Sequence, residues 1–351
     1  MGELSYGTTV SFLGVLDLWK DKPQSIVARR TLRVLGDPER RMRLCDQRLG
    51  LAAKAFKRFS DREQEAKTDY YACRRSIVDS AGKVRPVVFY VDTAFDASAY
   101  AAVERGLLLW NDAFAKIGCE DVVRVEPFPA DPAFNDNTLY NNCVRRTGTS
   151  NSELYTASWV DPRSGEILNA SVYVYHDVMK LLNNWLFVQT AQADERVRAV
   201  TIPEEVIGDG LRYVVAHEVG HCLGYMHNMS ASAVIPVDSL RSPSFTQKYG
   251  TTTSIMDYAR FNYVARPGDR ERGVKLTPPR FGLYDYYAVK WLYTPVPDAA
   301  TAVDEYAVTS KWMTEAAADS VYRFGKQQFS RSIDPLSLIH ISEPTRLRCI
   351  S

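Results

Sequence analysis

Four side chains able to bind a metal ion or work beside one lie within the segment His217-Glu218-Val219-Gly220-His221-Cys222-Leu223-Gly224-Tyr225-Met226-His227. An α-helix has about 3.6 residues per turn, so histidines four residues apart project from nearly the same face and can reach one ion. Glu218 is rotated by roughly 100° from His217, which places its carboxylate beside the ion. Gly224 can adopt the left-handed conformation that ends a helix, after which His227 can approach from another direction.

The number of ligands indicates a catalytic metal site. Three protein ligands leave the fourth tetrahedral position of Zn²⁺ open for water, whereas structural zinc sites are closed by four protein ligands. Zinc lowers the pKa of a bound water to about 7, and a neighbouring carboxylate can accept the proton. The segment therefore predicts one catalytic Zn²⁺ ion held by His217, His221 and His227, with Glu218 as the general base.

The extended pattern HExxHxxGxxH resembles the signature of the metzincin metallopeptidases, in which a methionine-containing turn lies beneath the metal. The run Ser254-Ile255-Met256-Asp257-Tyr258 is similar to that Met-turn. The resemblance implies that Met256 forms a hydrophobic floor under the zinc ligands without binding the metal. It also implies that Tyr258 contacts zinc or stabilises the tetrahedral intermediate of the reaction, although a buried structural tyrosine is the alternative.

Longer runs are similar to the large bacterial zinc-dependent metzincins, over roughly residues 85–335. They are DPRSGEIL, HEVGHCLGYMHNMSAS, VDSLRSPSFTQKYG and TTSIMDYARFNYVARPGD. One departure is Asn228, because better-known branches often carry Asp, Glu, Ser or Pro after the third histidine. This departure bears on the branch of the family and not on the metal.

The resemblance also carries expectations about fold, substrate and location. It implies an α+β catalytic domain with a twisted mixed five-stranded sheet, a backing helix and an active-site helix, followed by a smaller irregular C-terminal subdomain. The expected partner is a peptide or protein substrate, bound as an extended strand. The expected location is outside the cell or in the cell envelope.

Composition narrows the classes of partner. The 351 residues are 46% hydrophobic and 24% charged, which is enough for a sizeable core and two or three domains. A formal net charge of +1 gives no reason to expect nucleic acid as a partner. The sequence contains no run of about twenty apolar residues, so no transmembrane helix is predicted. The first residues do not resemble a signal peptide. The oligomeric state is not indicated.

Histidine and cysteine usage is consistent with a single metal site. Of five histidines, three are in the motif, His340 falls in the C-terminal tail, and His176 is read as a structural residue at a strand or helix end. No CxxC cluster suggests a second metal site. Cys222, between a ligand and the glycine that ends the helix, is predicted to be a small buried apolar residue.

Four regions are expected along the chain. Residues 1–84 are predicted to be the end of a preceding, partly β domain, with strand-like runs TTVSFLGVLDL and SIVARRTLRVL and a helix near KAFKRFSDREQEAK. Residues 85–224 are the N-terminal catalytic subdomain, and residues 225–335 the C-terminal subdomain with the third histidine and the Met-turn. Residues 336–351 resemble a translated sequencing adapter, so we predict a non-native tail there, and the start at Met1 is expected to lie inside a longer gene.

The first part of the catalytic region shows clear periodicity. PVVFYVD predicts a buried strand, and residues 97–117 predict a helix whose apolar stripe includes Val103, Leu107, Trp110 and Phe114, with Gly118 as the stop. A strand is predicted near VVRVEPF and a hairpin over YTASWVDPRSGEILNASVYVY, where Pro, Ser and Gly mark the turn. The second arm of this hairpin is the candidate for the strand that binds substrate.

Three further helices are predicted. Residues 178–193 form an amphipathic pattern, and Trp185 and Phe187 are expected in the core. The active-site helix is expected to begin near Thr201, where Thr201-Ile202-Pro203-Glu204 fits a capping box, although it could begin only after Gly210. Gly208 and Gly210 either mark close packing against the sheet or precede the helix. YDYYAVKWLY predicts the helix that anchors the C-terminal subdomain.

Taken together, the residues favour a zinc-dependent endopeptidase. His217, His221 and His227 hold zinc, Glu218 acts as general base and then as proton donor, and Tyr258 stabilises the oxyanion. Two alternatives remain: a catalytically silent binding module with the same fold and metal, and a zinc hydrolase that acts on a non-peptide amide. The presence of Glu218 weighs against a pure binding module, which has no chemical need for that carboxylate.

Overall fold

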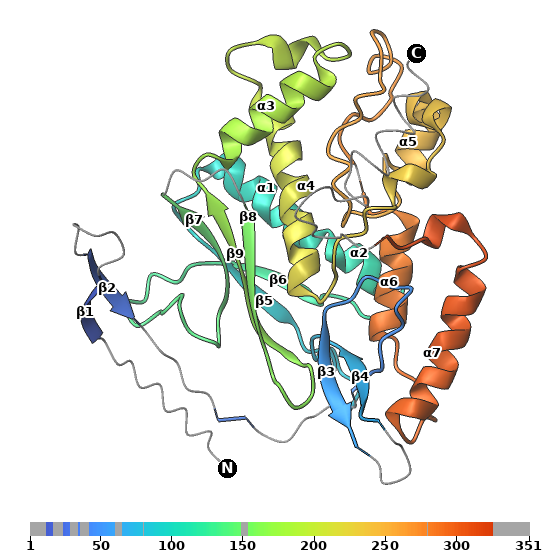
Figure 1. Ribbon diagram of the computed structural model, residues 1–351. Coiled ribbons are helices and arrows are strands. Elements are labelled where there is room, and N and C mark those ends of the chain that lie inside the picture. Colours follow the sequence, from blue (N-terminus) through green and yellow to red (C-terminus); the bar gives the residue numbers. More distant parts are fainter. Residues whose placement is uncertain are drawn as a thin grey trace.

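A mixed five-stranded sheet, covered on one face by helices, forms the centre of the molecule (Figure 1). The computed structural model describes residues 12–16, 24–28, 34–35, 42–59, 65–79, 81–148, 154–278 and 280–325. The strand order is β6-β5-β7-β9-β8. The strands are β5 (Val87–Val91), β6 (Val123–Pro127), β7 (Asn142–Thr147), β8 (Leu154–Val160) and β9 (Ile167–Tyr175). The predicted α+β fold class with a mixed five-stranded sheet is therefore confirmed.

The pairing of the strands corrects the expectation about which arm of the hairpin can bind the substrate. Strands β6, β5, β7 and β9 pair in parallel, and β8 pairs antiparallel with β9. The predicted hairpin is present, but its second arm, β9, is paired on both sides and has no free edge for a peptide. Within the described residues β8 pairs only with β9, so the first arm is the edge strand. Strand β7 was not predicted, because NCVRRT is short and carries two arginines.

Helix α1 (Ala97–Leu108) and helix α2 (Trp110–Ala115) occupy the span predicted as one helix. The side chain of Asp96 caps α1 by accepting a hydrogen bond from the amide of Ala99 at 2.9 Å. The predicted stripe is buried, and the chain leaves helical geometry at Gly118, where φ is +78°. Two details differ from the prediction: the helix is interrupted at Leu109, and it ends at Ala115, two residues before the predicted end at residue 117.

Helix α4 (Glu204–Cys222) is the predicted active-site helix, but it is not capped as predicted. Pro203 is the N-cap residue, with extended backbone (φ −55°, ψ 140°) and no side-chain cap. Thr201 therefore lies two positions too early to reach the first free amides of the helix. Gly208 and Gly210 lie inside the helix, so the later start after Gly210 is excluded.

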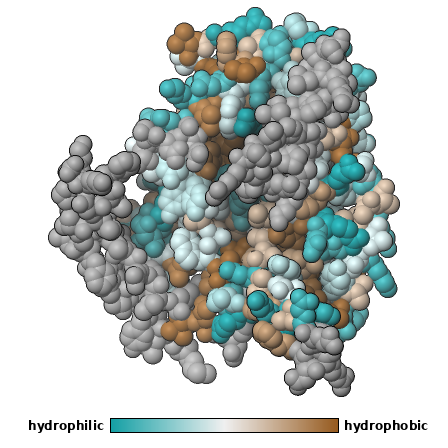
Figure 2. Space-filling view, in the orientation of Figure 1, coloured by the Kyte–Doolittle hydropathy of each residue, from teal (hydrophilic) through white to brown (hydrophobic). Residues whose placement is uncertain are grey.

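Helix α3 (Val178–Thr190) fills the connection between β9 and α4. Trp185 is half-buried against the core, and the guanidinium carbon of Arg260 lies 4.2 Å from the centre of its ring. Phe187 was expected in the core, but 54% of it is exposed. Hydrophobic side chains reach the surface at the top of the view in Figure 2, where α3 lies, and Phe187 and Val188 are among the exposed ones.

Two antiparallel hairpins precede the five-stranded sheet. One pairs β1 (Phe12–Leu16) with β2 (Gln24–Ala28), and the other pairs β3 (Ala53–Arg58) with β4 (Lys67–Ala72). The helix predicted near residues 54–67 is wrong for its first half, which forms β3. Cross-strand packing outweighs local helix propensity there, since the rings of Phe56 and Tyr71 meet edge to face at 5.5 Å. The domain boundary at residue 84 stays a prediction.

The C-terminal part is less regular, as expected. Its helices are α5 (Pro243–Tyr249), α6 (Leu283–Tyr293) and α7 (Ala302–Ala316). The predicted helix near YDYYAVKWLY is α6. Short 3₁₀ helices are η1 (Glu195–Arg198), η2 (Ser232–Val234), η3 (Val237–Arg241) and η4 (Ser320–Tyr322). Over the described residues of 250–282 there is no helix or strand. The predicted tail, 336–351, lies outside the described residues.

Buried hydrogen bonds replace regular structure in this part. Asp269, of which 1% is exposed, accepts hydrogen bonds from Arg241 at 2.8 Å, from Arg272 and from the amide of Arg266 at 2.9 Å. Burial alone would raise the pKa of Asp269, but these donors hold it well below its usual range. No described helix is both long and apolar enough to cross a membrane.

Two glycines lie where α1 and α4 pack together, and alanine substitutions at these positions test how closely the helices approach. A Cβ atom at Gly106 would lie 2.8 Å from the backbone oxygen of Arg212 and 3.0 Å from Cβ of Val215, whereas one at Gly208 would lie at least 3.6 Å from its neighbours. Alanine favours a helix over glycine by about 1 kcal/mol, while overpacking costs roughly 1–3 kcal/mol. We therefore expect Gly208→Ala to stabilise the protein and Gly106→Ala to destabilise it.

Urea unfolding of the two glycine variants and the wild type measures this difference. Gly208→Ala is the matched control, because it makes the same chemical change in the partner helix where space is available. A gain in stability for both variants would show that α1 and α4 do not pack as closely as described.

Candidate metal centre

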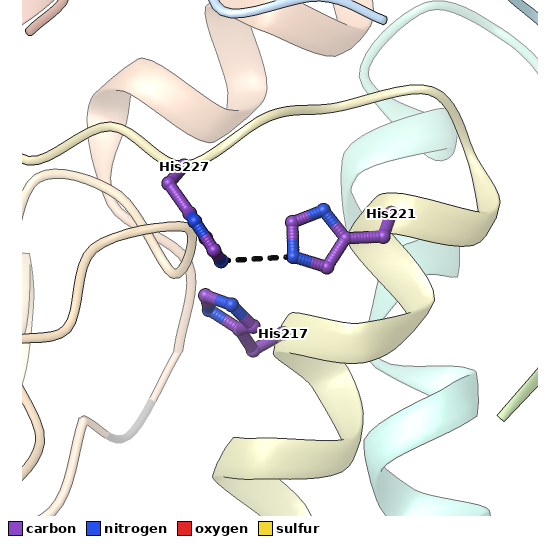
Figure 3. Close-up of side chains that lie close together, drawn as sticks. All are labelled: His217, His221 and His227. Carbon is purple, nitrogen blue, oxygen red and sulfur yellow. Dashed lines mark hydrogen bonds between the residues drawn. The ribbon is translucent and has the colours of Figure 1, made fainter. Parts of the chain in front are cut away.

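The three predicted ligands converge on one point (Figure 3). His217 and His221 project from α4, one turn apart, and His227 faces them from the loop that follows the helix. One ring nitrogen from each histidine lies within 4.8 Å of those of the other two. The Nε2 atoms of His221 and His227 are 3.1 Å apart. This spacing brings three nitrogen donors within reach of a single ion.

Backbone carbonyl groups fix the orientation of two of these rings. Nδ1 of His217 lies 2.7 Å from the oxygen of Ile255, and Nδ1 of His221 lies 2.7 Å from the oxygen of Tyr225. A carbonyl oxygen can only accept, so each Nδ1 must carry the proton and donate it. The Nε2 atom of each ring then keeps its lone pair for a metal, which is the usual arrangement of histidine ligands.

Two observations support a metal ion at this position. Nε2 of His217 is buried and has no hydrogen-bond partner, which is costly for a polar atom unless another group satisfies it. Burial, and then the neighbouring rings of His221 and His227, hold the pKa of His217 well below its ordinary value. The ring is therefore neutral near pH 7, as metal binding requires. Among the described residues the cluster consists of three imidazoles, a donor set that suits catalytic zinc.

Glu218 lies next to the first ligand and is held by the edge strand. Its Oε2 atom accepts a hydrogen bond of 2.6 Å from the hydroxyl of Thr156 on β8. Burial raises the pKa of Glu218, and the charge of His221 and the bond from Thr156 oppose this. A carboxylate with a raised pKa beside an open metal position can accept a proton and return it. The link to Thr156 also joins the carboxylate to the strand that has a free edge.

The Met-turn packs directly against the active-site helix. Met256 is 1% exposed, and a Cβ atom added at Gly220 would overlap its sulfur. Gly220 lies between His217 and His221 in the sequence of α4, so Met256 packs against the helix beside its two histidines, and its role as a floor under the metal stays a prediction. The oxygen of Met256 also accepts a hydrogen bond of 2.9 Å from the amide of Asn228, directly after the third ligand.

A buried carboxylate holds the Met-turn in place from α6. Asp285, 2% exposed, accepts hydrogen bonds from the hydroxyl of Ser254 at 2.7 Å, the amide of Ile255 at 2.7 Å and the amide of Gly282 at 3.0 Å. Burial raises the pKa of Asp285 to about 7, although these three donors oppose it. Since the oxygen of Ile255 orients His217, Asp285 acts on the first ligand through one intervening residue.

Tyr258 lies beside the ligands. The centre of its ring is 4.5 Å from that of His227 and 5.6 Å from that of His217, and the side chain is half-buried. The chain around it is held by Tyr213 of α4, whose hydroxyl donates to the oxygen of Asp257 at 3.1 Å and accepts from the amide of Arg260 at 3.2 Å. The position is the one predicted for Tyr258, while its role in the reaction stays a prediction.

Asn228, the departure noted in the sequence, has a structural role. It is fully buried, its Nδ2 donates to the oxygen of Arg323 at 3.0 Å, and its Oδ1 accepts from the amides of Ser230 at 3.3 Å and Gly325 at 3.0 Å. An amide group offers both a donor and an acceptor, whereas aspartate at neutral pH offers only acceptors. Asparagine therefore suits this site better than the acidic residues of other branches.

Sequence reasoning located the ligands but missed Thr156 and Asp285. Both lie in correctly predicted elements, yet nothing in a strand or helix pattern shows which polar residue meets a distant partner. His176 is exposed in the turn after β9, outside the histidine cluster, and its predicted structural role stays a prediction. Cys222 is fully buried, as predicted, and burial raises the pKa of its thiol to about 12. The five cysteines among the described residues form no disulfide bond with one another.

Comparison with known proteins agrees with the geometry. Residues 199–339 match the model of a protein family described as Met-zincin. The match spans less than half of the 351 residues, but it contains the three histidines, Glu218 and the Met-turn. Residues 199–339 are therefore similar to a Met-zincin domain, and they contain a three-histidine cluster able to bind a metal ion. Neither a curated protein nor a solved structure matches the chain.

Metal binding is expected to stabilise the folded protein, because the three nitrogens converge only in the fold. With free Zn²⁺ at 100 times its Kd, the stabilisation should be about 2.7 kcal/mol. A thermal unfolding scan of metal-free protein with and without Zn²⁺ measures this. The shift should be lost in His227→Ala and kept in His176→Ala, which removes a histidine outside the cluster. An equal shift in both variants would place the bound metal elsewhere.

Proposed function

We propose that the protein is a zinc-dependent endopeptidase. The observation that carries the proposal is the position of Glu218. It follows the first of three convergent imidazoles, interacts with the charge of His221 and is hydrogen-bonded to Thr156 of β8, the edge strand among the described residues. A metal site with an open position, a general base and an adjacent strand edge has the three parts that peptide hydrolysis requires. The match to the Met-zincin family supports the same conclusion.

In this proposal His217, His221 and His227 hold the zinc ion. When bound, zinc supplies Lewis acidity that polarises the scissile carbonyl and makes water acidic near neutral pH. Glu218 accepts a proton from the attacking water and then delivers it to the leaving nitrogen of the peptide. Thr156 holds the carboxylate in one orientation through both transfers. No covalent link between enzyme and substrate forms.

Tyr258 is proposed to stabilise the negative charge that develops on the carbonyl oxygen. The centre of its ring lies 4.5 Å from that of His227, and this closeness to a proposed ligand supports the role. Preorganised donors near a developing oxyanion commonly contribute about 2.7–4 kcal/mol to the lowering of the barrier. The hydrogen bonds of Tyr213 on either side of this segment would keep Tyr258 in place without direct contact with substrate.

The substrate is proposed to be a peptide or protein segment that adds to β8 as an extended strand. Main-chain groups along the edge of β8 would give affinity, and side chains on either side would give selectivity. Tyr155 and Trp159 of β8 are 56% and 43% exposed, so aromatic groups are available next to a bound strand. Nucleic acid is not proposed as a partner. Secretion or a cell-envelope location is proposed from the family resemblance.

A peptide-library digest tests the proposed function. Wild-type protein and Glu218→Ala are each loaded with Zn²⁺, and zinc content is measured alongside cleavage. We expect about one zinc per chain in both proteins, since three histidines supply the ligands, and cleavage in the wild type alone. Cleavage that survives in Glu218→Ala would contradict the assigned mechanism. Zinc binding without cleavage in either protein would favour a binding module, and hydrolysis confined to small amides would favour the third alternative.

A further inference from the structure

The loop between the second and third metal ligands is held from outside by an earlier part of the chain. This connecting loop, which we define as the last residue of α4 and the four residues after it (222–226), joins His221 to His227. The segment that holds it is residues 49–75, which we call the bracing segment. It precedes the region that matches the Met-zincin family by more than a hundred residues. Its contacts with the loop extend over the loop's whole length.

Arg75 binds the start of the connecting loop. Its Nε atom donates to the oxygen of Cys222 at 3.1 Å. The side chain is almost fully buried, and burial lowers the pKa of its guanidinium. Keeping a cation out of water is costly, so its retention needs a compensating interaction. The free carbonyl at the C-terminal end of α4 supplies one, because unpaired carbonyls and the helix dipole favour a positive group there.

Tyr293 binds the next residue of the loop. Its hydroxyl donates to the oxygen of Leu223 at 2.8 Å and accepts from the amide of Arg75 at 3.3 Å. Tyr293 is the last residue of α6 and is 1% exposed. One hydroxyl therefore links the bracing segment, α6 and the connecting loop.

The remaining contacts form a short antiparallel ladder. The amide of Ala52 donates to the oxygen of Gly224 at 2.9 Å, and the amide of Met226 donates to the oxygen of Gly50 at 2.9 Å. Leu51 and Tyr225 are the bridge partners between them. Gly224 has φ of +101°, and a Cβ atom there would overlap the oxygen of Cys73. Glycine is thus required both for the backbone conformation and for close contact with the bracing segment.

These contacts bear directly on the ligands. The oxygen of Tyr225, inside the ladder, accepts the hydrogen bond that orients His221. Met226, whose amide is bound to Gly50, directly precedes His227. The same part of the chain is fastened to the end of α6. Arg74, in the bracing segment, donates to the oxygen of Leu292, and Arg43, which precedes the segment, donates to the oxygens of Trp291 and the C-cap residue Thr294. The distance between the second and third ligands is therefore set from outside the loop that joins them.

We propose that the bracing segment positions His227 relative to His217 and His221, so that metal affinity depends on Arg75 and Tyr293. Both act as positioning residues, because neither is a metal ligand. The inference rests on the metal-binding part of the proposed function and not on peptide cleavage. The matched Met-zincin region is then incomplete as a metal site without residues that precede it.

The test measures zinc affinity by competition with a chromogenic chelator. Tyr293→Phe removes one hydroxyl and keeps the ring, and Arg75→Met keeps the length of the side chain while removing its donors. We expect the Kd for zinc to rise about tenfold or more in each, as for other residues that orient ligands. Tyr287→Phe is the matched control, because its hydroxyl lies on the same helix and its one hydrogen bond among the described residues is to the sulfur of Met313, at 3.8 Å. Its Kd should stay within about twofold of the wild type.

Hydrogen exchange of the metal-free proteins supplies a second, independent measurement. Amides of residues 222–227 should exchange faster in Tyr293→Phe and Arg75→Met than in the wild type or Tyr287→Phe. Unchanged exchange of these amides and an unchanged Kd in folded Tyr293→Phe would overturn the proposal, and so would an equal loss of affinity in Tyr287→Phe. Faster exchange in a chain that binds no zinc would leave the positioning of the loop supported and contradict the proposed zinc function instead.

Discussion

The hydrogen bonds from Nδ1 of His217 and His221 to backbone carbonyls are the constraint on which the site depends. Each bond fixes the tautomer of its ring and leaves Nε2 as a free donor for a metal. The two carbonyls belong to different parts of the chain, Ile255 in the Met-turn and Tyr225 in the connecting loop. Both must be placed correctly against α4 for the nitrogens to converge, so much of the surrounding packing serves to hold these two backbone segments.

The Met-turn and the connecting loop are held in different ways. Met256 packs against Gly220, and Asp285 accepts hydrogen bonds from the amide of Ile255 and the hydroxyl of Ser254, so both steric fit and buried polar bonds place the turn. The connecting loop instead relies on the ladder with residues 50–52 and on Arg75. Packed interiors respond to small changes in side-chain volume, and misplacement of either segment would separate the three nitrogens. Both segments pack against α4, whose second half is largely buried because α1, α3, β8 and β9 also pack against this helix.

Local patterns in the sequence predicted what depends on local chemistry. The spacing of His217, His221 and His227 fixed the metal site, and hydrophobic periodicity located β5, α1 and α6 closely. Such local patterns do not show which residues far apart in the sequence pair in the fold. Nothing in the sequence of the hairpin shows that β8, and not β9, has the free edge, nor that Thr156 meets Glu218. The helix predicted near residues 54–67 failed for the same reason, because β3 is stabilised by its partner strand.

X-ray absorption at the zinc edge of the metal-loaded protein tests the central claim most directly. The account predicts three imidazole nitrogens and one oxygen from water around a single ion, with zinc–nitrogen distances of about 2.0–2.1 Å. The same spectrum should be found for Glu218→Ala, because Glu218 is not a ligand. A fourth protein ligand, a sulfur in the first shell, or a spectrum that changes when Glu218 is removed would contradict a three-histidine site with an open position.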